Sequence, residues 1–231
     1  MTFTAWNFPS PHASAQPCPD IGVAFARGTS EPPGVGIIGQ AFVESLRTQA
    51  FPRTVGVHGV NYPASNDFFG PGFTLNVVDG SRDVLDHIRG VVSVCPHTQM
   101  IIGGYSQGAM VSAFATSDVL PGDVAPESAP IPLPADVADH VAAVVLFGKP
   151  TGVSLAKYKA PAVGASPIYA SKLLELCAPG DSVCSTDPSA PVDLVAHGEY
   201  AQNGMVGTGA TFAVSRLPVP PPPPGPPLSL P

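Results

Sequence analysis

The stretch GGYSQGAM, residues 103–110, places a serine between glycines directly after the apolar run Met100–Ile102. Its central part, Gly104–Gly108, fits the pattern G-x-S-x-G. That pattern is typical of a nucleophile elbow, a tight strand-to-helix turn that lifts a serine hydroxyl clear of the sheet. Glycine and serine are also common in ordinary turns, and short motifs match by chance. The rest of the chain has to decide between the two interpretations.

Short β-branched runs alternate with longer helical patterns along the chain, which predicts a parallel sheet flanked by helices, an α/β fold. The expected strands are residues 21–26, 54–60, 99–103, 141–147 and 168–176. The expected helices are residues 36–50, 76–93, 107–117 and 204–217. A chain of 231 residues is long enough for one such domain with a well-buried core.

Three segments are predicted to lie outside the regular part of this domain. Residues 120–136 are rich in proline and predict an irregular surface loop, and the proline-rich, uncharged residues 218–231 predict a disordered polyproline tail. Residues 1–17 form an N-terminal segment that contains Ala13-Ser14-Ala15, an A-x-A cleavage signature, and we interpret it as the remnant of an export signal. The domain itself is expected to span residues 18–217.

The composition narrows the range of partners. Only 12% of the residues are charged, the formal net charge is −7, and lysines and arginines are not clustered. Nucleic acid is therefore not an expected partner, because its phosphates require a basic surface. No apolar run approaches the ~18 residues of a transmembrane helix. The chain is expected to be a monomer that needs neither a metal ion nor another cofactor.

A second glycine motif, Gly34–Gly39, fits the dinucleotide fingerprint G-x-G-x-x-G. That fingerprint requires its first glycine immediately after a strand, so that the pyrophosphate meets a helix N-terminus. Here the sequence RGTSEPP intervenes between the strand and the first glycine, and no acidic residue ends the second strand. Nucleotide binding is not expected.

A serine hydroxyl becomes a useful nucleophile when a histidine takes its proton and a carboxylate orients that histidine. In the order Ser, Asp/Glu, His, the candidates downstream of Ser106 are His140 and His197. His140 precedes the strand 141–147, whereas active sites of parallel sheets lie at the carboxyl ends of strands. His197 follows the last strand and is therefore the expected base.

The orienting acid should follow the carboxyl end of the last strand, and Asp181 does so. Asp187 and Asp193 compete for this role in the same connection. For the developing oxyanion, the backbone N–H of Gln107 at a helix start is one expected donor. Thr29, in the loop after the first strand, is the second candidate. A sheet ordered 2-1-3-4-5 would make the first and third strands neighbours at the topological switch point, so that Thr29 and Ser106 would face one another. Thr29 is equally consistent with an ordinary turn.

Four cysteines, at positions 18, 95, 177 and 184, permit three disulfide pairings. Pairing Cys177 with Cys184 would close a short loop around Asp181 and leave Cys18 for Cys95. Four separate buried thiols are the alternative. Oxidised cysteines would indicate a protein that works outside the cytosol.

Six stretches together resemble the cutinase family of serine esterases, particularly the mycobacterial cutinase-like proteins. They are FARGTSEPPG, VNYPAS, GGYSQGA, LFGKP, CAPGDSVC and AHGEY. The resemblance runs from about Cys18 to Leu217. It implies a small α/β-hydrolase with a five-stranded parallel sheet and no large lid, a triad of Ser106, Asp181 and His197, and an oxyanion hole at Thr29 and Gln107. It also implies the disulfides Cys18–Cys95 and Cys177–Cys184, and secretion or association with the cell wall.

The expected activity is the hydrolysis of short- to medium-chain acyl esters or lipids through an acyl-enzyme. Phospholipase A or thioesterase activity would use the same three residues, and a catalytically silent secreted or cell-surface binding protein is the alternative of another class. The walls of a shallow acyl groove are predicted from apolar residues near Ser106 and His197, and each of them could instead be ordinary packing. These candidates are Phe68, Phe69, Leu194 and Val195.

Overall fold

The structure of this chain is a computed structural model, and it describes residues 17–68, 72–119, 124–157, 162–189, 191 and 193–219. The predictions for the export-signal remnant fall almost entirely outside the described residues. So does the predicted polyproline tail from residue 220 onward.

Five parallel strands form one sheet in the order β2-β1-β3-β4-β5, which confirms the predicted architecture. The strands are β1 (Ile21–Ala26), β2 (Val55–Gly59), β3 (Gln99–Tyr105), β4 (Val141–Phe147) and β5 (Leu173–Leu176). Every residue of β4 is buried because this strand is covered on both faces, which explains its unbroken apolar sequence VAAVVLF.

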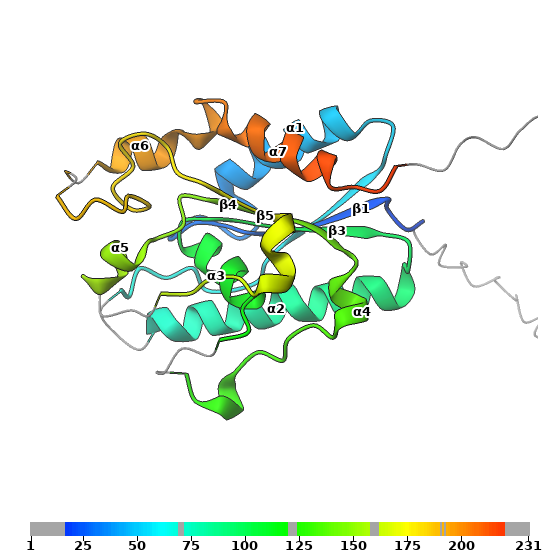
Figure 1. The fold of residues 1–231 in the computed structure, drawn as a ribbon, viewed down its shortest axis with the longest axis horizontal. Helices are drawn as coiled ribbons and strands as arrows, with labels where there is room; N and C mark the ends of the chain where they lie inside the picture. Colours follow the sequence, from blue (N-terminus) through cyan, green and yellow to red (C-terminus); the bar gives the residue numbers. More distant parts are fainter. Residues whose placement is uncertain are drawn as a thin grey trace, which may run out of the picture.

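Helices cover both faces of the sheet (Figure 1). On one face lie α1 (Gly36–Ala50) and α7 (Met205–Ser215), and on the other lie α2 (Gly72–Val94) and α3 (Gln107–Ala115). The described part of the chain also contains short α-helices, namely α4 (Ala135–Ala138), α5 (Gly152–Ala156) and α6 (Leu194–Gly198), and short 3-10 helices. α1, α2 and α7 each bury one apolar side, whereas every residue of α3 is buried. The core is divided into two layers, one on each face of the sheet.

The strand order reverses between β1 and β3: β2 is added on one side of β1, and β3, β4 and β5 on the other. β1 and β3 pair in parallel from Ile21–Gln99 to Ala26–Gly104. In open α/β sheets, a ligand site forms beside such a reversal, at the carboxyl ends of the strands. The loop after β1 and the turn after β3 therefore meet at one edge of the sheet.

The last strand is shorter than predicted. The expected strand 168–176 begins only at Leu173, because residues Pro167–Lys172 form a 3-10 helix, η2. Pro167 occupies the first turn of η2, where its fixed φ favours helical geometry, and Tyr169 donates its N–H to the Ser166 carbonyl. The apolar residues in this stretch resemble a strand, but in the helical turn Tyr169 is buried whereas Ile168 is exposed. The loop 120–136 also contains regular structure: the described part of it includes η1 (Pro126–Ser128) and the first residues of α4.

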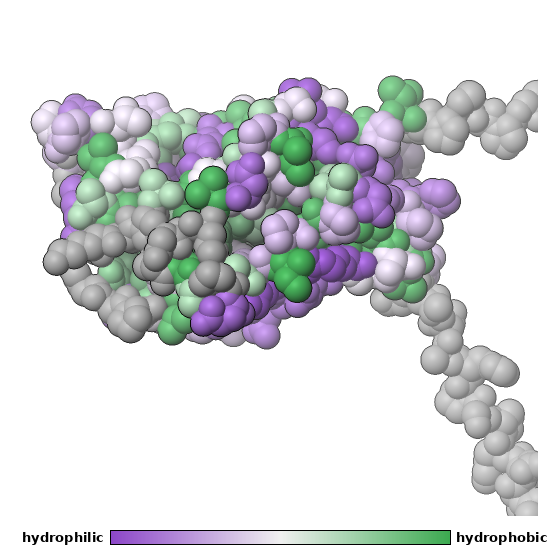
Figure 2. All heavy atoms as spheres, turned by 60° about the horizontal axis from the view of Figure 1, so that its bottom comes forward, coloured by the Kyte–Doolittle hydropathy of each residue, from purple (hydrophilic) through white to green (hydrophobic). Residues whose placement is uncertain are grey.

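The face that carries α2 and α4 mixes hydrophobic and hydrophilic residues, and in its described part the hydrophobic side chains are scattered among hydrophilic ones (Figure 2). Single exposed apolar residues are ordinary on protein surfaces. None of the helices in the described part of the chain combines the length and the hydropathy that a bilayer crossing requires.

Candidate active site

Ser106 sits in a sharp turn between β3 and α3, with its backbone at φ 54° and ψ −119°. The flanking glycines make this turn possible. A Cβ on Gly104 would lie 2.2 Å from the Gly108 carbonyl oxygen, and a Cβ on Gly108 would lie 2.0 Å from the Ala26 carbonyl oxygen. The backbone thus packs too closely for any side chain at these two positions. The turn has the geometry that G-x-S-x-G predicts.

Three side chains from distant parts of the sequence form a hydrogen-bonded chain at the carboxyl edge of the sheet. His197 Nε2 lies 2.9 Å from Ser106 Oγ, and His197 Nδ1 lies 2.8 Å from Asp181 Oδ2. The side chain of Asp181 is 0% exposed and that of His197 is 11% exposed. With Asp181 ionised, Nδ1 carries the imidazole proton, so the lone pair of Nε2 faces the serine hydroxyl.

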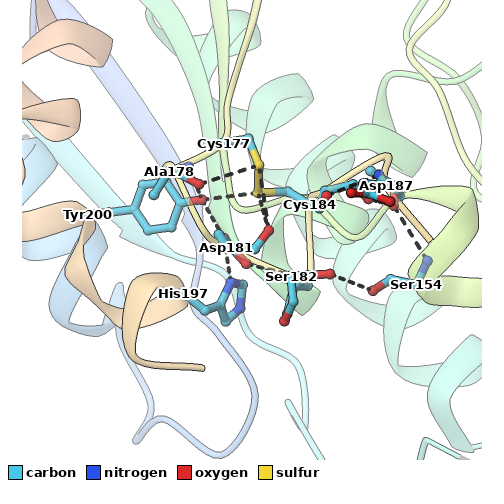
Figure 3. The surroundings of a disulfide bond; sticks show 12 residues. Ser154, Cys177, Ala178, Asp181, Ser182, Cys184, Asp187, His197 and Tyr200 are labelled. Atoms are coloured by element: carbon cyan, nitrogen blue, oxygen red, sulfur yellow. Dashed lines mark hydrogen bonds and ion pairs between the residues drawn. A yellow bond between two sulfur atoms is a disulfide. The ribbon is translucent and has the colours of Figure 1, made fainter. Parts of the chain in front are cut away.

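Asp181 is held by more than its histidine (Figure 3). The Val183 N–H donates to Oδ1 at 2.8 Å, and the Tyr200 hydroxyl donates to Oδ2 at 2.6 Å. Burial by itself raises the pKa of this carboxyl, but the hydrogen bonds from His197, Tyr200 and Val183 favour the charged form and bring the pKa below its usual value. Asp181 is therefore a carboxylate although it is buried.

Both disulfides that the resemblance implied are present. Cys177–Cys184 closes the loop around Asp181, and Cys18–Cys95 joins the segment before β1 to the residue that follows α2. Among the described residues, Cys177, Asp181 and Cys184 form the one cluster with metal-ligand atoms close together. Its two sulfurs are bonded to each other, so neither is a thiolate that could bind a metal ion.

The two competing aspartates, Asp187 and Asp193, accept hydrogen bonds from groups other than the His197 imidazole. Asp187 is exposed and accepts hydrogen bonds from the backbone and hydroxyl of Ser189, and these bonds lower its pKa. Figure 3 shows it on the far side of Cys184 from His197. Asp193 is the N-cap of α6 and accepts the N–H groups of Val195 and Ala196.

His140 lies immediately before β4, at the edge of the sheet opposite the serine turn. The other end of β4 contacts that turn, because Ser106 N–H donates to the Phe147 carbonyl at 2.9 Å. The sequence predicts this edge correctly, and the position before a strand there would favour a surface histidine, which the structure corrects. His140 is half buried, and its Nδ1 is a buried atom without a hydrogen-bond partner among the described residues.

The sequence analysis did not identify the residues that fix the position of His197. The Tyr105 hydroxyl donates to the His197 carbonyl at 2.8 Å, and the two rings lie 5.0 Å apart. Gly148 has φ +57°, and a Cβ there would lie 2.9 Å from His197 Cε1. Tyr105, Gly148 and Tyr200 all lie inside the motifs GGYSQGA, LFGKP and AHGEY. The motifs contain these residues, but the sequence alone does not say which atoms they approach.

Thr29 and Gln107, the two candidates for the oxyanion hole, lie next to each other across the switch point. Thr29 Oγ1 is 3.5 Å from Gln107 Oε1, at the outer limit of a hydrogen bond, and Gln107 Nε2 donates to the Ser65 carbonyl at 3.2 Å. The Gln107 side chain is thus buried between two loops. Its backbone N–H begins α3, where the first amides of a helix have no intrahelical acceptor.

A buried cation holds the loop that carries Thr29. The Arg27 guanidinium donates to the carbonyls of Glu31, Val60 and Tyr62 at 2.8, 3.2 and 2.7 Å, and it lies 5.0 Å from the centre of the Tyr62 ring. The Glu31 carboxylate accepts the Gly28 N–H at 2.6 Å and also binds the N-terminus of α1. The loop is therefore fixed on both sides of Thr29.

The acyl-groove candidates have different surroundings. Leu194 and Val195 lie on α6 with His197 and are 66% and 72% exposed. Phe68 is half buried and packs against the core, with its ring 5.8 Å from that of Phe73. Phe69 lies outside the described residues. The groove itself stays a prediction.

Comparisons with known proteins agree with this architecture. A family model described as Cutinase matches residues 17–217. "Probable carboxylesterase Culp7" of Mycobacterium tuberculosis is 49% identical over 74% of this chain and 89% of its own length. "Phospholipase Culp4" of the same organism is 43% identical over 90% of this chain and 83% of its own length.

A solved structure titled as a Trichoderma reesei cutinase in complex with a phosphonate inhibitor is similar at a TM-score of 0.64, with 34% identity over 88% of this chain and 78% of that one. The resemblance that the sequence motifs indicated is confirmed, and the chain belongs to the cutinase family, whose members are carboxylic-ester hydrolases.

Proposed function

We propose that this carboxylic-ester hydrolase works through an acyl-enzyme on Ser106. Ser106 Oγ attacks the acyl carbonyl carbon while His197 Nε2 takes the hydroxyl proton. The bond to the leaving oxygen then breaks, and Nε2 returns the proton to that oxygen. Water attacks the acyl-serine ester by the same route, which releases the carboxylic acid and restores the hydroxyl. Asp181 orients the imidazole and stabilises it while it is positively charged.

The observation that supports this proposal most strongly is the continuous chain Ser106–His197–Asp181, with both links shorter than 3 Å. A chance cluster of polar residues would not also hold its serine at a positive φ, or bury its carboxylate under several hydrogen bonds. Backbone strain of this kind concentrates at functional sites.

The oxyanion of the tetrahedral intermediate would be held by the Gln107 N–H and by Thr29. Among the described residues, the Thr29 hydroxyl has only a long contact, with Gln107 Oε1, so it can turn toward a developing negative charge at small cost. Arg27 and Glu31 keep the loop in place before the substrate arrives. Such preorganised donors supply a large part of the rate enhancement in acyl transfer.

The proposed substrates are short- to medium-chain acyl esters or lipids. Leu194 and Val195 expose apolar surface on the same short helix as His197, and an acyl chain could lie along them. Each methylene that such a groove buries contributes about 0.8 kcal/mol, and carbons beyond its end contribute nothing further. Phospholipase A activity is the second candidate, because a relative that is 43% identical is named a phospholipase.

We further propose that the protein acts outside the cytosol, as a monomer. Two disulfides support the location, since such bonds persist in oxidising compartments and are rare in the cytosol. One of them holds the loop of Asp181, so the proposed site itself depends on that environment.

Replacing the proposed nucleophile tests this function. Ser106→Ala should lower turnover of a short p-nitrophenyl ester by at least about 10³-fold with an unchanged fold, because the attacking atom is removed. Ser93→Ala is the matched control, since Ser93 is exposed near the end of α2. If Ser106→Ala keeps turnover close to that of the control, the proposed triad is wrong. A wild-type protein that hydrolyses no ester at all would favour the silent binding protein.

A further inference from the structure

Tyr200 is a completely buried tyrosine at the back of the proposed triad. It lies in the 3-10 helix η3 (Glu199–Ala201), three residues after His197. Its ring packs against those of Tyr105 and Phe147, with centroids 5.9 Å apart in each pair and the rings edge to face. This packing fixes the position of the phenol oxygen.

The Tyr200 hydroxyl connects three parts of the site (Figure 3). It donates to Asp181 Oδ2 at 2.6 Å and accepts the Ala178 N–H at 3.0 Å, and it lies 3.4 Å from Cys184 Sγ. A phenol has one proton and can both donate and accept. Here the hydroxyl donates its single proton to Asp181 and accepts a hydrogen bond from the Ala178 N–H in the disulfide loop.

Asp181 Oδ2 therefore receives two donors, the imidazole Nδ1–H and this hydroxyl. Two donors on one oxygen restrict the carboxylate to a single orientation. Burial, and then the hydrogen bond with Asp181, raise the pKa of Tyr200 above its ordinary value, so the hydroxyl keeps its proton at neutral pH. It can serve Asp181 only as a donor.

We propose that Tyr200 is a positioning residue of the reaction, whose hydroxyl holds the Asp181 carboxylate in register with His197 and ties it to the disulfide loop. The inference rests on the proposed triad. Tyr200 does not touch the substrate, because its side chain is completely buried. Its effect reaches the reacting atoms through Asp181 and His197.

The test is the pH–rate profile of Tyr200→Phe, which keeps the ring and removes the hydroxyl. We expect kcat to fall on the order of tenfold with KM unchanged, the size of one lost hydrogen bond to a charged group. The acid limb should also move to higher pH. Without the hydroxyl, Asp181 becomes easier to protonate, and Oδ2 attracts the imidazolium proton more strongly, so the working form is lost earlier as pH falls.

The other titratable groups near Asp181 and His197 are unchanged in this variant. Tyr105 on β3 faces His197, and burial, and then the Glu31 carboxylate in the loop after β1, raise the pKa of Tyr105. Tyr169→Phe is the matched control, since Tyr169 is also buried but lies in η2. Rates are referred to the concentration of active sites, measured by titration with a fluorophosphonate, so that any unfolded fraction is not counted.

If the role of Tyr200 is merely structural, Tyr200→Phe should lower the melting temperature but leave kcat per active site and the acid limb unchanged, as in Tyr169→Phe. That result would overturn the proposal. Ser106→Ala, measured in parallel, keeps the two hypotheses apart. If Ser106→Ala is inactive and Tyr200→Phe behaves as wild type, only the role of Tyr200 is wrong. If Ser106→Ala is active, the triad itself is wrong.

Discussion

Ser106 adopts a backbone conformation that residues other than glycine rarely adopt. A positive φ of 54° at such a position costs on the order of 1–3 kcal/mol, and it persists only where the surroundings impose it. Here the turn is fixed by the close approach of Gly108 to Ala26 and by the hydrogen bond from Ser106 N–H to the Phe147 carbonyl. The strain places the hydroxyl at the edge of the sheet, within reach of His197.

The role of Thr29 can be tested by removing only its hydroxyl. Thr29→Val keeps the shape of the side chain, and if the hydroxyl donates to the oxyanion, kcat should fall by roughly 10²-fold, the usual effect of losing one such donor. Thr29→Ser retains the hydroxyl and should stay within a few-fold of wild type. The measurement is kcat for a short p-nitrophenyl ester.

Equal turnover in Thr29→Val and wild type would show that the hydroxyl contributes nothing. The second donor would then be the Thr29 backbone N–H, which neither substitution removes.

Several elements were predictable because one local signal determined them. Strand β4 is a continuous apolar run, and α1 begins and ends where its periodicity does, at Gly36 and Ala50. The predicted start of β5 was wrong, because the apolar residues Ile168–Ala170 are equally compatible with a strand and with a helical turn. Pro167 was the signal for the turn. The contacts of Arg27 and Tyr200 depend on loops far away in the sequence, which no local pattern reveals.

Between β2 and α2, two histidines stack on each other. The rings of His58 and His87 lie 3.9 Å apart and nearly parallel, and His58 Nε2 is 2.6 Å from Asp83 Oδ2. Burial, and then the nearby His58, lower the pKa of His87 from 6.5 to about 4, although Asp83 acts in the opposite direction. The His87 imidazole between α2 and the edge strand is therefore neutral at neutral pH.

This arrangement predicts a loss of stability in mild acid. The unfolded chain binds a proton at His87 near pH 6.5, and the folded chain only near pH 4. The contribution of neutral His87 to the free energy of unfolding is therefore complete above pH 6.5 and declines as the pH falls toward 4. The loss should be on the order of 2 kcal/mol, since His87 is partly exposed. His87→Phe should reduce this decline in the free energy of unfolding, measured by urea denaturation at several pH values.

His97→Gln is the control for this series, because His97 is exposed and lies outside the stack. If His87→Phe and wild type lose the same free energy of unfolding between pH 6.5 and 4, the stacked pair does not control the response to acid.

At the scale of the whole molecule, the order of the strands brings the proposed site together. Ser106 follows β3, Asp181 follows β5 and His197 lies on α6, yet all three meet at the carboxyl edge of one sheet. This much could be predicted, because parallel topology sends consecutive carboxyl ends to the same edge. The width and depth of the space in front of Ser106 could not be predicted, since they depend on how the surrounding loops pack.

Substrate size is the property that depends most on this packing. With a shallow groove, kcat/KM for p-nitrophenyl esters should rise about fourfold for each added methylene and then level off at medium chain length. It should show no jump at the concentration where the substrate forms micelles. A steady rise to very long chains together with such a jump would mean that a lid covers the site.

Covalent labelling by a fluorophosphonate tests the central claim most directly. Only a serine activated by a base reacts with this probe at neutral pH, and mass mapping of the digested protein identifies the modified residue. We predict one label per chain, on Ser106, with loss of labelling in Ser106→Ala and strong slowing in His197→Gln. A protein that stays unlabelled, or that carries the label on a different residue, would contradict the account.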